Sequence, residues 1–312
     1  MRNATVTVFG GSGFIGEQVV KRLADDGAMV RVPTRNPALS GYLCPLGEVG
    51  QVVPVKLAGV EPGDIDAAMA GSTHVVNLIG IMHERKAGDF DRIHGELAGT
   101  IARSASEHRV RSLVHISAIG ADSGALSAYA RSKAKGEEAV RDAFGDATIL
   151  RPSVVFGPGD GFFHRFAEMA TLSPVLPLVD GGETRFQPVY VGDVADAVLT
   201  CLGGTHAGIY ELGGPEVKTF RQLLSYMLEK LGRGNRLVNV PSGILEFPAR
   251  LMEYLPNPPL TRDQLLLLKR DNVVSANART LSDLGIHPTP MEIVVPRVVK
   301  AFARPRIEVP AI

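Results

Sequence analysis

Short apolar runs alternate with helix-like stretches along the first half of the chain. The first run alternates valines with threonines and ends at Phe9, which predicts a short buried strand. Apolar residues at helical spacing between Ile15 and Leu23 then predict an amphipathic helix, which Gly27 ends. Four more strands are predicted at 29–32, 51–57, 74–78 and 113–116. Strands alternating with helices in this way predict an α/β fold with a doubly wound parallel sheet.

A glycine cluster joins the first predicted strand to the first predicted helix. Its three glycines fall three residues apart, and such glycines also occur in purely structural turns. A strand before them and a helix after them are the context that dinucleotide binding requires, because glycine lets the backbone approach a phosphate and a helix N-terminus attracts the anion. The predicted pyrophosphate site comprises Gly10, Ser12, Gly13, Phe14, Ile15 and Gly16.

The residue after the second strand distinguishes the two nicotinamide dinucleotides. Folds that prefer NAD usually place an aspartate or glutamate near this point, where it accepts hydrogen bonds from the ribose. This chain has Arg35 there instead, and a guanidinium suits a 2′-phosphate. The alternative interpretation is a solvated loop arginine. We expect NADP(H) to be the cofactor, with NAD(H) less favoured.

Tyr129 and Lys133 lie four residues apart at the start of a helix that follows the fifth strand. Positions i and i+4 share a helix face, so both side chains point the same way. An ammonium favours a nearby phenolate, and we therefore expect Lys133 to lower the pKa of Tyr129 and make it a general acid/base. Surface packing is the alternative interpretation. The position beside the dinucleotide sheet favours a catalytic pair at the nicotinamide.

The glycine turn and the tyrosine–lysine pair together make the chain resemble the short-chain dehydrogenase/reductase superfamily, in its extended or atypical branch. This resemblance implies that Asp193 caps a helix. It also implies cofactor contacts from strand ends and loops, at Leu57, Leu78, Ile79, Gly80, Ser117, Tyr129, Lys133, Pro152 and Val154.

The chain departs from the pattern of this superfamily in two places. The aspartate expected after the third strand, near the adenine, is missing, with Lys56 and Leu57 there. The second departure is from the active members. They carry a serine or threonine shortly after the fifth strand, where this chain has Ala118 and Ile119. Ser117 at the strand end and Ser123 in the following loop are the hydroxyls that remain as catalytic candidates.

A narrower resemblance covers nearly the whole chain. It is similar to the NADPH-holding accessory subunit of respiratory complex I, the alpha-subcomplex subunit 9 type, and to its bacterial relatives. This implies a structural, assembly or sensing role for the bound nucleotide, with a respiratory-complex or membrane-peripheral protein as partner. The alternative is an active NADPH-dependent reductase or epimerase/dehydratase that acts on a small carbonyl or nucleotide-sugar substrate. The resemblance is carried by the segments 76–80, 141–144, 187–191, 260–263, 283–286 and 289–290.

Two regions organise the predicted fold. We expect a Rossmann-type domain over 1–155, completed by a stretch near 188–213, and a smaller C-terminal α/β lobe over 156–312. Within that lobe, 172–178 predicts an extended loop on the substrate side. The apolar stretch 238–268 either covers the cleft or packs as core, or it forms a partner or membrane-surface patch.

Charge and composition narrow the functional class. Lysine plus arginine and aspartate plus glutamate both number 33, so no excess charge points to nucleic acid. The eight histidines show no ligand spacing, and we expect no metal site. No apolar run reaches the ~18 residues of a membrane span, and the first strand begins too early for a signal peptide. We expect a cytoplasmic protein, with the cytoplasmic face of the inner membrane as an alternative location.

Overall fold

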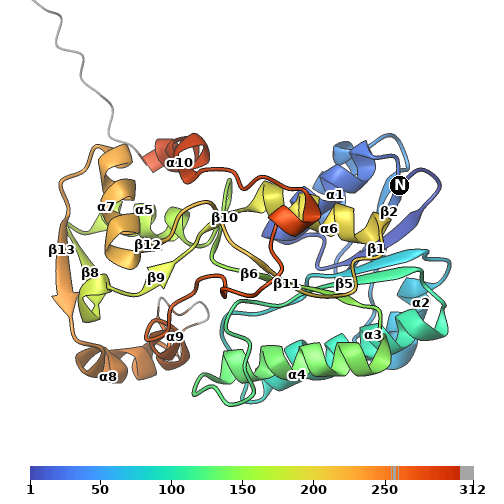
Figure 1. Ribbon diagram of the computed structural model, residues 1–312, viewed down its shortest axis with the longest axis horizontal. Coiled ribbons are helices and arrows are strands. Elements are labelled where there is room, and N and C mark those ends of the chain that lie inside the picture. Colours follow the sequence, from blue (N-terminus) through green and yellow to red (C-terminus); the bar gives the residue numbers. More distant parts are fainter. Residues whose placement is uncertain (254, 256–257, 259, 303–312) are drawn as a thin grey trace, which may run out of the picture.

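A parallel sheet of seven strands forms the centre of the molecule, in the order β11-β6-β5-β4-β1-β2-β3. The computed structural model describes residues 1–253, 255, 258 and 260–302. The strand order reverses beside β1, so a crevice is expected at the carboxyl ends of β1 and β4. The predicted Rossmann-type, doubly wound class is therefore confirmed (Figure 1). The strands are β1 (Thr5–Phe9), β2 (Met29–Thr34), β3 (Val52–Lys56), β4 (His74–Asn77), β5 (Ser112–Ile116), β6 (Thr148–Pro152) and β11 (Gly208–Leu212).

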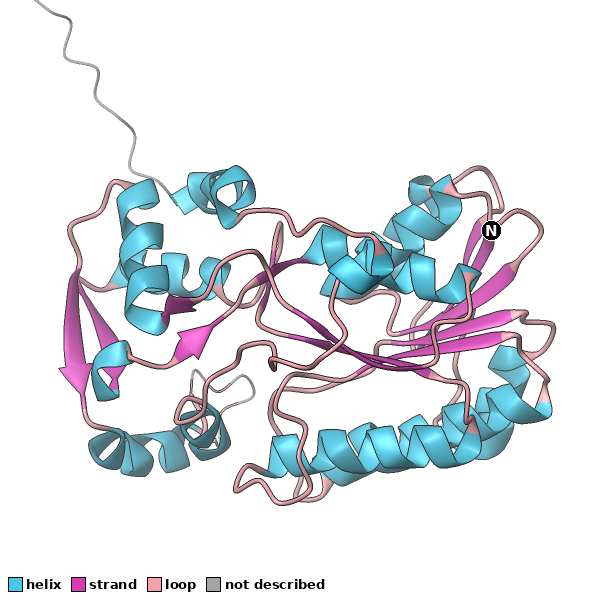
Figure 2. Cartoon of the chain, in the orientation of Figure 1, coloured by secondary structure: helices cyan, strands magenta, loops and turns pink. Residues whose placement is uncertain are grey.

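Helices cover both faces of this sheet, as Figure 2 shows. On one face α1 (Phe14–Asp25) packs beside α6 (Val191–Gly203), and their apolar residues share a core with the valines of β1. The opposite face carries α2 (Pro62–Met69), α3 (Leu97–Glu107) and α4 (Ala128–Ala143). Alternate residues of the central strands β1, β4 and β5 thus meet a different helix layer, which is why these strands are buried on both faces.

A π-helix, η2 (Asp91–Glu96), precedes α3 and lies against α4. The two elements approach so closely at Gly136 that a Cβ added there would overlap the carbonyl oxygen of His94. A glycine at this position therefore lets α4 settle against η2. The approach brings His94 beside the face of α4 that carries Lys133.

The C-terminal part has its own apolar cluster, built on α5 (Phe163–Leu172), α7 (Phe220–Leu231) and α10 (Met291–Val299). Beside it, β8 (Val175–Val179) pairs in parallel with β13 (Arg236–Val240). The prediction of an extended loop over 172–178 is therefore wrong for its second half. A proline is tolerated there because β8 pairs on one side only, and its other edge needs no donor. The domain boundaries stay a prediction.

None of the helices among the described residues is long and apolar enough to cross a membrane.

Shorter elements link these parts of the chain. The remaining strands are β7 (Val155–Phe156), β9 (Arg185–Phe186), β10 (Val189–Tyr190) and β12 (Lys218–Thr219). The remaining helical segments are η1 (Ala38–Leu46), η3 (Asp180–Gly182), α8 (Ser242–Met252), α9 (Arg262–Leu267), η4 (Ser282–Leu284) and η5 (Lys300–Phe302).

The apolar stretch 238–268 divides its side chains between core and surface. Ala249 on α8 and Leu265 on α9 are buried together against Val179. Ile244 and Phe247 are instead 65% and 71% exposed on α8. One side of α8 therefore packs as core while the other presents apolar residues. Tyr254, Pro256 and Pro259 of this stretch lie outside the described residues.

Asp193 has a different role from the one expected. The N-cap of α6 is Tyr190, and Asp193 lies within the first helical turn. Its carboxylate accepts hydrogen bonds from the N–H (2.6 Å) and the hydroxyl (2.8 Å) of Thr289. The predicted cap is therefore wrong, because a partner 96 positions away takes the side chain.

Candidate functional site

The glycine turn lies at the carboxyl end of β1, where the sheet order reverses. Gly10 has a φ of 79°, and a Cβ there would lie 3.0 Å from the carbonyl carbon of Leu78. A Cβ on Gly16 would overlap the carbonyl oxygen of Gly10. These two glycines are therefore required for the turn itself.

Gly13 differs from these two, because a Cβ added there would meet only one protein atom, the Gly10 oxygen at 3.3 Å. Gly13 is also the N-cap of α1, and no side chain caps this helix. The first N–H groups of a helix have no partner within it, and together with the helix dipole they attract anions. The turn thus presents an uncapped helix N-terminus beside Ser12, as a pyrophosphate site requires.

Arg35 follows β2 and is exposed, and no hydrogen bond or ion pair holds it among the described residues. Nearby in the chain, the hydroxyl of Tyr42 on η1 donates a hydrogen bond to the carbonyl oxygen of Ser12 (2.9 Å). This bond connects η1 to the glycine turn. Sequence reasoning missed Tyr42, because no motif marks a contact over 30 positions. Leu57, just after β3, is buried and donates its N–H to Thr34 at the end of β2 (2.9 Å).

Tyr129 and Lys133 share one face of α4, as predicted from their spacing. Lys133 is buried, its Nζ donates to the carbonyl oxygen of Ile116 (3.1 Å), and it lies 6.0 Å from the centroid of the Tyr129 ring. A Cβ on Gly80 would lie 3.5 Å from the same Nζ. The structure thus brings the loop after β4 together with the pair on α4, next to Ile79.

The pKa of Tyr129 shifts in the opposite direction to the one expected. Burial raises the pKa of Tyr129 to about 12, and the negative charge of Asp263 adds to this. Burial also lowers the pKa of Lys133 to about 8, against the opposing effect of Glu137. The expectation of a lowered tyrosine pKa is therefore wrong. Tyr129 is a protonated phenol at neutral pH.

Two buried histidines lie beside Lys133. The N–H of Ile81 donates to His94 Nε2 (3.0 Å), so Nδ1 carries the proton and donates to the Ser132 hydroxyl (2.8 Å). Neither ring nitrogen of His115 has a hydrogen-bond partner among the described residues. Burial, and secondarily the charge of Lys133, lowers the pKa of each histidine to about 3. Both rings are therefore neutral at physiological pH.

The two candidate serines do not complete a catalytic triad. Ser117 is buried at the end of β5; its N–H donates to Leu150 (2.8 Å), and its hydroxyl has no partner in the described part of the chain. Ser123 is exposed in the loop that precedes α4 and makes no hydrogen bond to Tyr129 there. Ser117 therefore lies directly after β5, as expected, but neither serine hydroxyl is hydrogen-bonded to the Tyr129 side chain in the described part of the chain.

Pro152 is the last residue of β6, and the loop after it, which carries Val154, is held by a residue from the C-terminal part. The N–H of Val154 donates to Asn272 Oδ1 (3.1 Å). The other end of that amide, Nδ2, donates to the carbonyl oxygen of Ile119 (3.3 Å). Asn272 therefore fixes the loops after β5 and β6 relative to each other.

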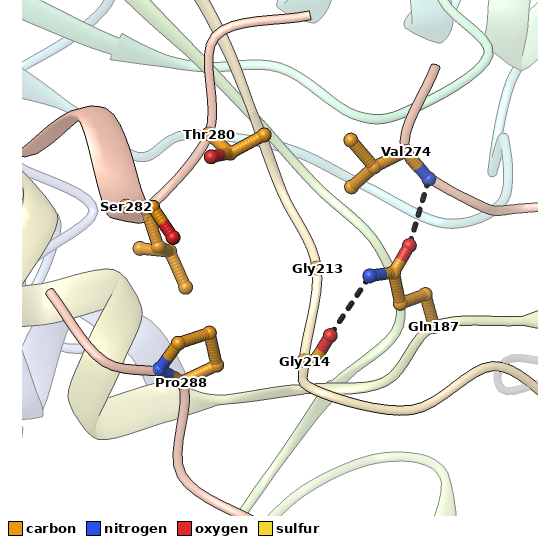
Figure 3. A pocket seen from close by; sticks show the side chains of 8 residues that line it. Gln187, Gly213, Gly214, Val274, Thr280, Ser282 and Pro288 are labelled. Atoms are coloured by element: carbon orange, nitrogen blue, oxygen red, sulfur yellow. Dashed lines mark hydrogen bonds between the residues drawn. The ribbon is translucent and has the colours of Figure 1, made fainter. Parts of the chain in front are cut away.

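A separate cavity of about 200 Å³ lies between the loop after β11 and the segment 274–288 (Figure 3). Gln187 crosses one side of it, donating from Nε2 to Gly214 (2.8 Å) and accepting the Val274 N–H at Oε1 (3.0 Å). None of the predicted cofactor residues lines this cavity. The cavity is lined by Gln187, Gly213, Gly214, Val274, Thr280, Leu281, Ser282 and Pro288.

No group of three or more metal-binding side chains occurs in the described ranges.

The model of the NAD dependent epimerase/dehydratase family matches residues 6–213, which include the glycine turn, Tyr129 and Lys133. The chain belongs to the NAD dependent epimerase/dehydratase family. The extended short-chain dehydrogenase/reductase resemblance is thereby confirmed.

The relatives of this epimerase/dehydratase chain include both a respiratory-chain subunit and a reductase. Over 296 residues it is 36% identical to the mitochondrial NADH dehydrogenase [ubiquinone] 1 alpha subcomplex subunit 9 of Arabidopsis thaliana, covering 90% of this chain and 74% of that protein. Over 243 residues it is 30% identical to the ceramide reductase of Caulobacter vibrioides, covering 77% of this chain and 75% of that protein.

Solved structures of low identity show the same fold. The UDP-glucose 4-epimerase of Thermotoga maritima, solved with UDP-glucose, has a TM-score of 0.72 at 18% identity and covers 96% of this chain and 98% of its own. The UDP-glucose 4-epimerase of Thermus thermophilus, solved with NAD, has a TM-score of 0.69 at 22% identity, with the same two coverages.

Because His115 is buried in its neutral form, we expect the folded protein to lose stability as the pH falls. Between pH 6.5 and pH 3 the unfolded chain binds a proton at His115 that the folded chain does not, so the free energy of unfolding falls as the pH falls. At pH 5 this residue alone costs about 2 kcal/mol relative to pH 7.5. We expect His115→Leu to reduce the pH-dependent loss by that amount in urea unfolding. The exposed His287→Leu is the control; an equally steep loss in both variants contradicts the prediction.

Proposed function

We propose that this chain binds NADP(H) across the carboxyl ends of its sheet and holds it in a structural, assembly or sensing role. One observation carries the proposal: the glycine turn leads into a helix N-terminus that no side chain caps, while the positions expected to carry the catalytic hydroxyl hold Ala118 and Ile119. Relatives named as subunit 9 of a respiratory NADH dehydrogenase support this role. The cytoplasmic location stays a prediction, since those relatives are mitochondrial.

Three parts of the nucleotide have a proposed counterpart in the chain. The pyrophosphate is proposed to lie on Gly13 and the N-terminus of α1, where no side chain competes for the N–H groups. The 2′-phosphate is proposed to pair with Arg35, an exposed guanidinium without a protein partner among the described residues. The nicotinamide ribose is proposed to contact the Lys133 ammonium, which points between Gly80 and Ile116.

The exposed side of α8 is the proposed contact with a protein partner of the respiratory complex. Phe247 and Leu251 are 71% and 57% exposed there, four residues apart on one helical face with Ile244. Contiguous exposed apolar area usually marks an interface. A protein partner fits this side better than a nucleic acid, because the formal net charge of the chain is zero.

A second function is favoured by the intact pair on α4. Tyr129 is protonated at neutral pH and lies beside the Lys133 ammonium, which is the state needed to donate a proton to a carbonyl oxygen. A reductase relative, the ceramide reductase of Caulobacter vibrioides, supports this alternative. The chain would then be an active NADPH-dependent reductase or epimerase/dehydratase.

Arg35→Ala tests the preference for NADPH. Losing a charge-assisted pair costs about 1.5–3 kcal/mol, so NADPH affinity should fall about tenfold or more while NADH affinity changes little. Calorimetric titration of both nucleotides measures this. Arg141→Ala is the control: it removes an exposed arginine on α4, away from the proposed 2′-phosphate contact, and should leave both affinities unchanged. Equal affinities for NADPH and NADH in the unmodified protein would contradict the preference.

Gly13→Val tests where the pyrophosphate lies. The new side chain meets little protein, so the variant should fold, but it would occupy the space above the helix N-terminus and abolish nucleotide binding. Gly63→Val, at a glycine with open space on α2, is the control for a valine at a helix start. Folding is checked by circular dichroism and binding by calorimetry. A folded Gly13→Val protein with normal NADPH affinity would place the phosphates elsewhere.

Tyr129→Phe separates the two functions. It removes only the hydroxyl, so nucleotide affinity should change by no more than about 1 kcal/mol in either case. A nucleotide-holding protein should then still complement a deletion strain, whereas an enzyme should lose its reaction by 10² or more. Complementation and nucleotide binding are measured on the same variant. Loss of complementation with intact binding would favour the enzyme and reject the accessory role.

A further inference from the structure

The helix that carries Tyr129 and Lys133 is capped from the C-terminal part of the chain. Asp263 Oδ1 accepts a hydrogen bond from the N–H of Ala128 (2.7 Å). Its Oδ2 accepts from the N–H of Tyr129 (3.2 Å) and from the hydroxyl of Ser127, the N-cap of α4 (2.7 Å). One carboxylate therefore takes two backbone donors and the cap hydroxyl at the start of α4.

This carboxylate is well suited to fix the first turn. The first N–H groups of a helix have no partner inside it, and a negative charge there is favoured by the helix dipole. Asp263 itself lies in the first turn of α9, whose start is closed by a capping box between Thr261 and Gln264. The carboxylate is thus presented from a rigid helix start, and Figure 1 shows α9 between α8 and α4.

The same part of the chain holds the other loops beside the pair. Arg270 Nη1 bonds to Asp122 Oδ2 in the loop after β5 (3.0 Å). Asn272, as described above, bonds to Val154 and Ile119. We call residues 263–272 the clasp. It contacts α4 and both loops at the nicotinamide side of the proposed site.

We propose that Asp263 is a positioning residue for Tyr129 and Lys133, and that through it the docking of the clasp and the binding of the nucleotide strengthen each other. Lys133 lies one turn beyond the capped residues, so a fixed first turn adds to the bond with Ile116 in holding its ammonium in place. Coupling between two sites is reciprocal, so a bound nucleotide must stabilise the clasp by as much as the clasp strengthens binding. This inference rests on the proposed nucleotide site.

Asp263→Asn removes the charge while keeping the size and one acceptor oxygen. Hydrogen–deuterium exchange and calorimetry are carried out with and without saturating NADPH. In the unmodified protein we expect NADPH to protect the clasp. In Asp263→Asn we expect faster exchange at 128–133 without nucleotide, NADPH affinity about 3–30-fold weaker, and loss of the NADPH-dependent protection of the clasp. A purely structural role would not remove that nucleotide dependence.

Asp283→Asn is the matched control, because the Asp283 carboxylate likewise accepts from the backbone and from a hydroxyl, both of Thr280, and makes no hydrogen bond or ion pair with α4 in the described part of the chain. It should behave as the unmodified protein does. Unchanged exchange at 128–133 and unchanged affinity in Asp263→Asn would overturn the proposal. If Asp263→Asn fails to fold, the exchange of the unmodified protein tests the proposal instead. The proposal is overturned if NADPH does not slow exchange in the clasp.

Failure of the proposed function gives a different result. An unmodified protein that binds neither NADPH nor NADH rejects the nucleotide site and with it the coupling. The positioning role of Asp263 is then judged on exchange at 128–133 alone. Faster exchange in Asp263→Asn than in Asp283→Asn supports it, and equal exchange rejects it.

Discussion

A buried ion pair holds α4 against the sheet, and the geometry of the candidate site depends on it. Glu137 accepts two hydrogen bonds from Arg151 on β6, at 2.8 Å and 2.6 Å, and its side chain is 2% exposed. Glu211 on β11 lies 3.6 Å from the same guanidinium. Removing one partner of such a pair typically costs 3–5 kcal/mol, because a charge is left buried without compensation. The bidentate geometry also fixes the rotation of α4 about its axis.

That rotation determines where the chemistry lies. Tyr129, Lys133 and Glu137 follow at i, i+4 and i+8, so one face of α4 carries all three toward the sheet. Glu137 favours the charged form of Lys133 and opposes the effect of burial on its pKa. Asp263 likewise raises the pKa of Tyr129, because its negative charge disfavours the phenolate. Both carboxylates therefore favour the protonated form of their neighbour, and together with the burial of Tyr129 this gives an ammonium next to a neutral phenol at neutral pH.

Local patterns predicted much of the fold, because they are set by neighbours in the chain. The alternating valines before Phe9 and the glycine turn after it identify β1 and its phosphate loop, and the i, i+4 spacing identifies the pair on α4. Long-range contacts could not be predicted in this way. The Asp263 cap spans 134–136 positions, and it contributes to the pKa direction that sequence reasoning had wrong. Asp193 was likewise misassigned, because its carboxylate accepts hydrogen bonds from Thr289, 96 positions away.

The loop after β5 bears most directly on whether this chain performs chemistry. Ile119 donates its N–H to Pro152 (3.0 Å) and accepts from Asn272, so its backbone is held on both sides. Asp122, further along, is held by Arg270. Because the loop is fixed at both points, it keeps Ser123 exposed and does not bring that hydroxyl to Tyr129. The proposed nucleotide-holding role requires the glycine turn, a cation at the ribose and a fixed helix, for which Gly13, Lys133 and the capped start of α4 are the candidates. The missing hydroxyl is needed only for catalysis, and this favours the holding role.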